Sequence, residues 1–248
     1  MLRCSIIIPV LNEASCIGLA LRHLAQLHPP PFEIIVVDGG STDGTQAAIA
    51  REIPLSPVPI SLIDRPPGRA LQMNAGARVA NGEVLCFLHA DTWVPQDLVT
   101  VMTQTLADPR VVAGGFISLM QGPTVTRWGT SLHNYLKTYY APLLFRPHLF
   151  VKGLRLLFGD QVMFCSSQAF WTCGGFDPAL PIMEDGDLCL QLAYLGRIRL
   201  VNRVVCSSDR RVAKWGPLRA NVIYLMIGLL WGFGVPTPWL KRFYEDVR

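Results

Sequence analysis

Three aspartates of this chain, Asp38, Asp91 and Asp185, stand where their carboxylates could do chemistry together. Asp38 and Asp91 each close an apolar run that is typical of a strand buried on both faces of a parallel sheet. Open α/β sheets bind their ligands at the carboxyl ends of such strands. Carboxylates placed there can bind a base or ribose, hold a hard cation beside a diphosphate, or take a proton. Together they suit displacement of a nucleoside diphosphate by an alcohol.

Two of these positions have a purely structural alternative. Asp91 could cap the helix expected to follow Pro95. Asp185 belongs to the cluster Glu184-Asp185-Gly186-Asp187 at the start of an expected helix, where acidic residues are favourable because of the helix dipole. The dipole explains one such residue better than three within four positions, because like charges repel. The residues alone leave both alternatives open.

The elements that must position these side chains alternate along the first half of the chain. Strands are expected at 5–10, 33–38, 60–63 and 84–88, and helices at 14–27, 45–51 and 70–80. This alternation with short links predicts an α/β fold, a doubly wound, mostly parallel, Rossmann-like sheet. Further elements are expected at 98–106, 111–119, 162–165, 169–173, 181–195 and 198–206.

Composition limits the organisation and the partners. The 248 residues suffice for one large α/β domain. We predict a domain at 1–215, made of halves 1–92 and 93–215, followed by an apolar helix and tail at 216–248. A net charge of +4 is too mild to indicate nucleic acid. Seven cysteines without a CxxC pair predict buried free thiols in a reducing compartment. No signal peptide is recognised, so a cytoplasmic location is expected.

Two segments of the sequence could contact a membrane. No Asp or Glu occurs from Val111 to Gly159, where basic and aromatic residues mix. This pattern fits either a solvated basic face or a surface that meets an anionic or apolar acceptor. The apolar run 222–235 is shorter than the roughly 20 residues that span a bilayer. It either packs on the protein or lies in a membrane interface, so peripheral contact with the inner face of the cell membrane is a second expectation.

Several common site patterns are missing from the sequence. There is no P-loop, which argues against an NTPase, and Gly39-Gly40-Ser41 is not the GxGxxG of NAD-binding proteins. No Cys/His set has zinc spacing, and no GxSxG nucleophile elbow occurs.

Four ordered motifs carry a family resemblance that covers roughly residues 4 to 210. Ile7–Glu13, Val36–Thr45, His89–Asp91 and Glu184-Asp185 resemble the motifs of family 2 glycosyltransferases. Residues 68–76 and 87–92 further resemble a small bacterial subgroup labelled arsenosugar-biosynthesis or carotenoid-acid glycosyltransferases. Residues Arg210, Arg211 and Trp215 loosely resemble the Arg-Trp motif of processive synthases.

The resemblance implies a GT-A fold with a C-terminal acceptor-side region. It also implies inverting transfer of one sugar from a nucleotide-diphosphate sugar, UDP- or GDP-linked, to a hydroxyl or carboxyl acceptor. That acceptor would be a lipid, a carotenoid-like compound or another small metabolite. A divalent metal, Mn²⁺ or Mg²⁺, is the implied cofactor.

Single residues acquire roles from the same resemblance. Asp185 matches the catalytic base, and Asp91 matches the last Asp of the DxD motif, which ligates the metal with the diphosphate oxygens. The first Asp of DxD is His89 here, which can hydrogen-bond ribose but brings no fixed negative charge, so metal affinity is expected to be weaker. The remaining nucleotide-sugar residues are Pro9, Leu11, Glu13, Asp38 and Arg69, and those of the donor and acceptor pocket are Gly174, Gly175, Phe176, Glu184 and Arg211.

Two rival functions are retained. A nucleotidyltransferase would also join such a sheet to a sugar nucleotide, but it usually has a Gly-rich loop where this chain has Pro9-Val10-Leu11-Asn12-Glu13. A degenerate, non-catalytic module that binds a sugar nucleotide at a membrane is favoured only by His89.

Overall fold

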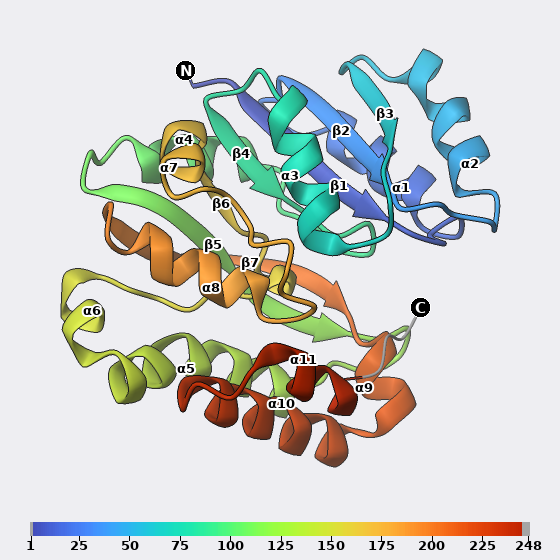
Figure 1. The fold of residues 1–248 in the computed structure, drawn as a ribbon. Helices are drawn as coiled ribbons and strands as arrows, with labels where there is room; N and C mark the ends of the chain where they lie inside the picture. The colour runs from blue at the N-terminus through green and yellow to red at the C-terminus, as the bar shows by residue number, and fades with distance from the viewer. Residues whose placement is uncertain (1, 245–248) are drawn as a thin grey trace.

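A seven-stranded sheet forms the centre of the computed structural model, which describes residues 2–244 (Figure 1). The strand order is β3-β2-β1-β4-β6-β5-β7. In this described part, β6 runs antiparallel to β4 and β5, and the other neighbours pair in parallel. The strands are β1 (Cys4–Val10), β2 (Glu33–Asp38), β3 (Ile60–Asp64), β4 (Val84–Phe87), β5 (Val111–Gln121), β6 (Phe164–Ser166) and β7 (Arg197–Ser208). The predicted mostly parallel α/β fold is confirmed.

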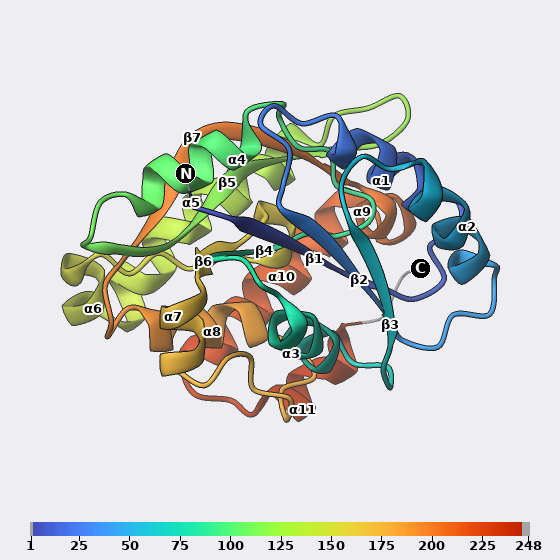
Figure 2. The same ribbon diagram turned by 90° about the horizontal axis from the view of Figure 1, so that it is seen from above.

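Helices cover both faces of the sheet, as the view from above shows (Figure 2). One face carries α1 (Ile17–Ala25), α2 (Thr45–Glu52) and α4 (Leu98–Leu106), and the other carries α3 (Arg69–Val79), α7 (Ser167–Thr172) and α8 (Glu184–Leu192). A further layer lies beside the β5–β7 half (Figure 1). It contains α5 (Trp128–Phe145), α6 (Pro147–Lys152), α9 (Arg210–Trp215), α10 (Pro217–Gly232) and α11 (Thr237–Leu240). Short 3-10 turns lie at Ile53–Leu55, Gly159–Gln161 and Lys241–Phe243.

The central strands are buried on both faces, which explains their uninterrupted apolar sequences. In β1, Ile6 and Ile8 belong to the core under α1 and α4, whereas Ile7 belongs to the core under α3 and α8. In β2, Val36 and Val37 divide in the same way. Successive side chains of a strand point to opposite faces, so both faces require apolar residues.

The strand ends create one edge where distant segments meet. β1 and β4 pair in parallel, with Ile7 opposite Phe87, so their carboxyl ends lie side by side. β4 ends at Phe87, and a turn carries the chain on to Asp91. The strand is therefore one residue shorter than expected, and Asp91 lies on the loop after it.

The C-terminal helix begins earlier than the apolar run suggested. α10 starts at Pro217, and it packs on the protein through the buried residues Ala220 and Ile227. Asn221 on this helix donates a hydrogen bond to Thr130 of α5 at 3.1 Å. Leu218 remains largely exposed. Among residues 2–244, no helix combines the length and the hydropathy needed to cross a bilayer. Membrane contact stays a prediction, as does the division at residue 215, and residues 245–248 of the expected tail lie outside the described part.

Candidate functional site

A cavity of about 590 Å³, called here the polar cavity, lies at the edge formed by the ends of β1 and β4. Its walls also come from the starts of α3, α8 and α9 and from the Gly159–Gln161 turn. Most of the residues singled out in the sequence line it. They are Pro9, Leu11, Glu13, Arg69, His89, Asp91, Glu184, Asp185 and Arg211.

Asp185 and Glu184 enter this cavity from the first turn of α8, and both are buried. One oxygen of Asp185, Oδ2, accepts hydrogen bonds from the Gly159 amide at 2.9 Å and from Arg69 Nη2 at 3.2 Å. Arg69 also donates from Nε to Glu184 Oε1. The second Glu184 oxygen is buried without a hydrogen-bond partner in the described residues. Arg69 thus links both carboxylates while it lines the polar cavity, and its approach to a nucleotide stays a prediction.

Burial sets the protonation of this group. It raises the pKa of Asp185 to about 7, Arg69 opposes the rise, and the neighbouring Glu184 adds to it. A carboxyl that titrates near neutral pH can accept a proton from an alcohol and release it again, as general-base catalysis requires. Asp185 has the burial, the fixed position and the pKa of such a base.

The acidic cluster at the start of α8 divides between two sites. Met183 precedes the helix in the left-handed region, with φ +67°, a conformation that non-glycine residues adopt at a cost in strain. Glu184 and Asp185 then face the polar cavity, whereas Asp187 lines a second cavity and accepts a hydrogen bond from Gln191 at 2.6 Å. The separation explains how three carboxylates fit within four residues.

Arg210, at the start of α9, joins two other carboxylates of the polar cavity. It donates to both oxygens of Glu13, at 2.9 and 3.0 Å, and to Asp91 Oδ2 from Nη2 at 2.7 Å. Its Nε also donates to Asp91 at 3.2 Å. α4 begins only at Leu98, so the helix-capping alternative for Asp91 is wrong. The Asp91 side chain lines the polar cavity instead.

His89 and Arg211 also lie in the cavity wall. The His89 ring packs against Gly159 so closely that a Cβ atom there would come within 2.7 Å of it. Burial and the nearby Arg69 lower the pKa of His89, which favours a neutral imidazole. Arg211 donates a hydrogen bond to the Tyr244 hydroxyl, and its guanidinium carbon lies 4.3 Å from the centre of the Tyr244 ring. The family resemblance assigns Arg211 to the donor and acceptor pocket, but it is Arg210 that forms ion pairs with Glu13 and Asp91.

Asp38 does not line the polar cavity. It is completely buried, and it accepts hydrogen bonds from the Ser41 amide at 3.0 Å and from Gln46 at 2.7 Å. Ser41 in turn accepts a hydrogen bond from the Asn12 amide at 2.9 Å. Asp38 therefore fixes the loop that carries Glu13.

The turn Gly174-Gly175-Phe176 lies outside both cavities, contrary to expectation. Both glycines have positive φ, and Phe176 is buried. The Asn74 side chain of α3 donates to the Phe176 carbonyl at 2.7 Å and accepts from its amide at 3.0 Å. The turn is held against α3 and positions the segment leading to α8.

Sequence reasoning also missed Asn134, Lys137 and Asp160, which line the polar cavity. Asn134 of α5 donates to Asp160 at 2.7 Å. Lys137, one turn further along α5, is buried with Nζ 3.7 Å from the centre of the Phe158 ring, and burial lowers its pKa to about 8. The acid-free stretch 111–159 was the available signal, but it could not show which face of α5 turns inward.

As the predicted metal ligand, Asp91 would supply one carboxylate. Within residues 2–244, no group of three or more His, Cys, Asp and Glu side chains is placed to hold an ion. Mg²⁺ is usually bound through one or two carboxylates together with substrate phosphates. The site therefore fits an ion that the protein and a diphosphate hold jointly.

The sequence matches relatives over most of its length. Residues 5–172 match the profile described as "Glycosyl transferase family 2". The chain is 27% identical over 214 residues to a pre-mycofactocin glycosyltransferase of Mycobacterium tuberculosis, which covers 84% of this chain and 43% of that protein. It is 32% identical over 136 residues to glycosyltransferase AglE of Haloferax volcanii, 53% of this chain and 43% of that one. The chain thus spans less than half the length of these relatives.

Solved structures share the fold. The mannosyltransferase PcManGT of Pyrobaculum calidifontis, in complex with GDP-Man and Mn²⁺, superposes with a TM-score of 0.72 at 22% identity, covering 99% of this chain and 65% of that one. Glucosyl-3-phosphoglycerate synthase of Mycobacterium tuberculosis, with Mn²⁺, UDP and phosphoglyceric acid, gives 0.65 at 20% identity, covering 95% and 80%. The profile match over residues 5–172 establishes that the chain belongs to glycosyltransferase family 2.

Proposed function

We propose that this protein transfers one sugar from a nucleotide-diphosphate sugar to an acceptor hydroxyl, with Asp185 as the base. The observation that carries the proposal is the buried Asp185, whose pKa lies near 7, in the same cavity as Asp91 and Arg210. PcManGT, which shares the fold, was solved with GDP-Man and Mn²⁺. That similarity supports a nucleotide sugar as the donor class.

The donor nucleotide would lie against the end of β1. Pro9, Leu11 and Glu13 form that part of the cavity wall. Asp38 would act on the nucleotide indirectly, since its hydrogen bond to Ser41 fixes the loop beside Glu13. The neutral His89 can donate or accept one hydrogen bond to a sugar hydroxyl.

The diphosphate would lie beside the ion pair of Asp91 and Arg210, at the start of α9. Asp91 would hold Mn²⁺ or Mg²⁺ jointly with the diphosphate oxygens, and such an ion supplies positive charge to the leaving group. Arg210 lies within 2.7 Å of Asp91, so its guanidinium can also stabilise the negative charge that develops on the leaving diphosphate.

The transfer itself is a single in-line displacement. The acceptor oxygen forms a bond to the anomeric carbon while the bond from that carbon to the diphosphate oxygen breaks, and its electron pair leaves with the nucleoside diphosphate. The hydroxyl proton passes to the Asp185 carboxylate. One displacement at the anomeric carbon inverts its configuration.

A thermal-shift screen with UDP, GDP, CDP, TDP and ADP, each with and without Mn²⁺, tests the donor site. One nucleotide is expected to raise the melting temperature in a metal-dependent way, because a ligand that binds only the native state stabilises it. Asp91→Asn should remove the metal dependence, whereas Asp97→Asn, a matched change at an exposed ion pair with Arg203, should keep it. No shift with any nucleotide would contradict the proposed donor site, whereas a shift without any sugar transfer would favour the degenerate module.

Product analysis with the matching sugar nucleotide tests the chemistry. Asp185→Asn should retain the nucleotide-induced shift and lose transfer by about 10²- to 10⁴-fold, the usual contribution of a general base. Retained turnover would remove Asp185 from this role. If added inorganic diphosphate converts the sugar nucleotide into a nucleoside triphosphate and a sugar 1-phosphate, the protein is a nucleotidyltransferase instead.

A further inference from the structure

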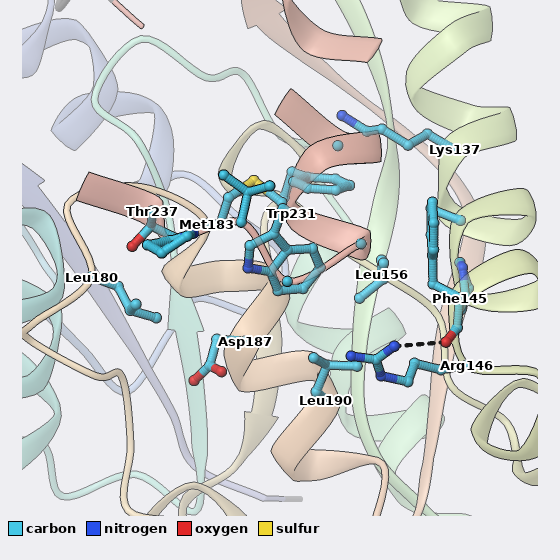
Figure 3. A pocket seen from close by; sticks show the side chains of 18 of the residues that line it. Lys137, Phe145, Arg146, Leu156, Leu180, Met183, Asp187, Leu190, Trp231 and Thr237 are labelled. Atoms are coloured by element: carbon cyan, nitrogen blue, oxygen red, sulfur yellow. Dashed lines mark hydrogen bonds between the residues drawn. The ribbon is translucent and has the colours of Figure 1, made fainter. Parts of the chain in front are cut away.

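A second cavity, called here the apolar cavity, has a volume of about 470 Å³ and lies between α5, α8, α10 and the segment that follows α10 (Figure 3). Trp231 stands at the centre of the view, with Met183, Leu156 and Leu190 around it. Phe145 of α5 lies to the right of Trp231 in this view. Cavities of this size bind small molecules, which bury most of their surface against apolar walls.

The apolar cavity adjoins the polar cavity at the start of α8. Lys137, Phe158, Met183 and Gly228 line both. Met183 lies two positions before Asp185. Gly186, directly after Asp185, is so close to the Trp231 ring that a Cβ atom would come within 3.1 Å of it. A molecule lying in the apolar cavity therefore has the polar cavity and its base at one end.

Charged groups in the apolar cavity are largely occupied by interactions with the protein. Asp187 accepts the hydrogen bond from Gln191, and Arg146 donates to the Phe145 carbonyl at 2.7 Å. Lys137 lies over the Phe158 ring at the junction with the polar cavity. The walls thus favour a ligand that is apolar along its length and polar at the end nearest Asp185.

We infer that the acceptor is an amphipathic alcohol, whose apolar body fills this cavity and whose hydroxyl reaches Asp185. This inference rests on the proposed glycosyl transfer, for which it names the acceptor class. Gly228 supports it, since this residue of α10 lines both cavities and places no side chain in either. No atom lies within 4 Å of the place where its Cβ would be.

Binding of linear alcohols from hexan-1-ol to decan-1-ol, in the presence of the stabilising nucleotide and Mn²⁺, tests the inference. Burial of each methylene is worth about a fourfold gain in affinity, so Kd should fall steadily with chain length. A Kd that does not change with length would overturn the inference.

Quenching by 10-bromodecan-1-ol locates the alcohol. The bromine quenches tryptophan emission on contact, and the quenching is expected to disappear in Trp231→Phe, which keeps an aromatic wall. Quenching that survives in this variant would place the alcohol on exposed apolar surface, at Trp128 for example, and would refute the site.

A variant that adds a side chain to the cavity, compared with a matched control, also tests the site. Gly228→Leu should weaken decan-1-ol binding at least tenfold, because its side chain enters the free space. Gly129→Leu is the same change at an exposed helical glycine of α5, also with no atom within 4 Å of its Cβ, and should bind decan-1-ol normally. Unchanged binding by folded Gly228→Leu would contradict the inference.

If Gly228→Leu does not fold, Leu190→Asn provides a second variant for the same binding test. Leu190 lines only the apolar cavity, and Leu195→Asn, an exposed position just after α8, is its control. The first should weaken decan-1-ol binding at least fivefold and leave the nucleotide-induced melting shift intact. Normal decan-1-ol binding by Leu190→Asn would overturn the inference, and a wild-type protein without a nucleotide shift would overturn the proposed function itself.

Discussion

Replacing Arg69 by methionine is expected to raise the pKa of Asp185. The Arg69 Nη2 atom lies 3.2 Å from Asp185 Oδ2, and the pair is partly buried, with 38% of the arginine side chain exposed. Two unit charges at this distance interact with about 1.3 kcal/mol even at the dielectric constant of water, which corresponds to about one pKa unit. A partly buried pair interacts more strongly. Glu184 would also lose its partner, and its negative charge raises the pKa of Asp185 further.

The change would move the pKa of Asp185 from about 7 to about 8 or above. A base must be ionised, so the ionised fraction at pH 7 would fall from about one half to about one tenth. Activity would accordingly rise through a higher pH range than in the wild type.

Carbon-13 NMR of protein labelled at aspartate carboxyls measures this titration without an acceptor. The Asp185 signal is assigned by its absence in Asp185→Asn, and Arg69→Lys, which keeps the positive charge, is the control. We expect a midpoint at least about one unit higher in Arg69→Met, and a smaller change in Arg69→Lys. An unchanged or lowered midpoint in Arg69→Met would refute the assigned electrostatics.

Three further outcomes are expected. Burial raises the pKa of Asp185 in the folded protein from 3.8 to about 7, so this group lowers the stability of the protein as pH rises through that range. The melting temperature of Asp185→Asn, relative to that of the wild type, should therefore increase from pH 4 to pH 8. A difference that stays constant over this range would contradict the prediction. Gly76→Ala should lower the free energy of unfolding in urea by about 1–3 kcal/mol, because the added Cβ atom would come within 2.5 Å of Ile7. Gly129→Ala should not lower it, since no atom lies within 4 Å of the added Cβ atom. Reductively methylated Lys137, followed by carbon-13 NMR, should titrate near pH 8, because burial disfavours its charge; a midpoint near 10.5 would show a solvated amine.

Much of the fold follows from local sequence pattern. The apolar runs ending at Val10 and Asp38 predicted β1 and β2 nearly residue by residue, and α4 lies at the predicted 98–106. Alternating strands and helices predicted the parallel sheet. Parallel strands bring their carboxyl ends to one edge, so the approach of Glu13 and Asp91 could also be foreseen.

The partners of those side chains could not be foreseen. Arg210 and Arg211 are adjacent, and only the path of the chain after β7 decides that Arg210 reaches Glu13 and Asp91 while Arg211 stacks on Tyr244. The same holds for Arg69, which lies 116 positions from Asp185 and yet is its ion-pair partner.

The sequence by itself therefore determined the sheet, its order of elements in the first half, and the residue types gathered at its edge. These depend on burial and on the period of apolar residues, which act over a few neighbouring positions. Only the tertiary structure decided which arginine meets which carboxylate, that Gly174 and Gly175 hold a turn rather than a pocket, and that α5, α8 and α10 enclose an apolar cavity. These features depend on how elements far apart in the chain pack, and no local period encodes that packing.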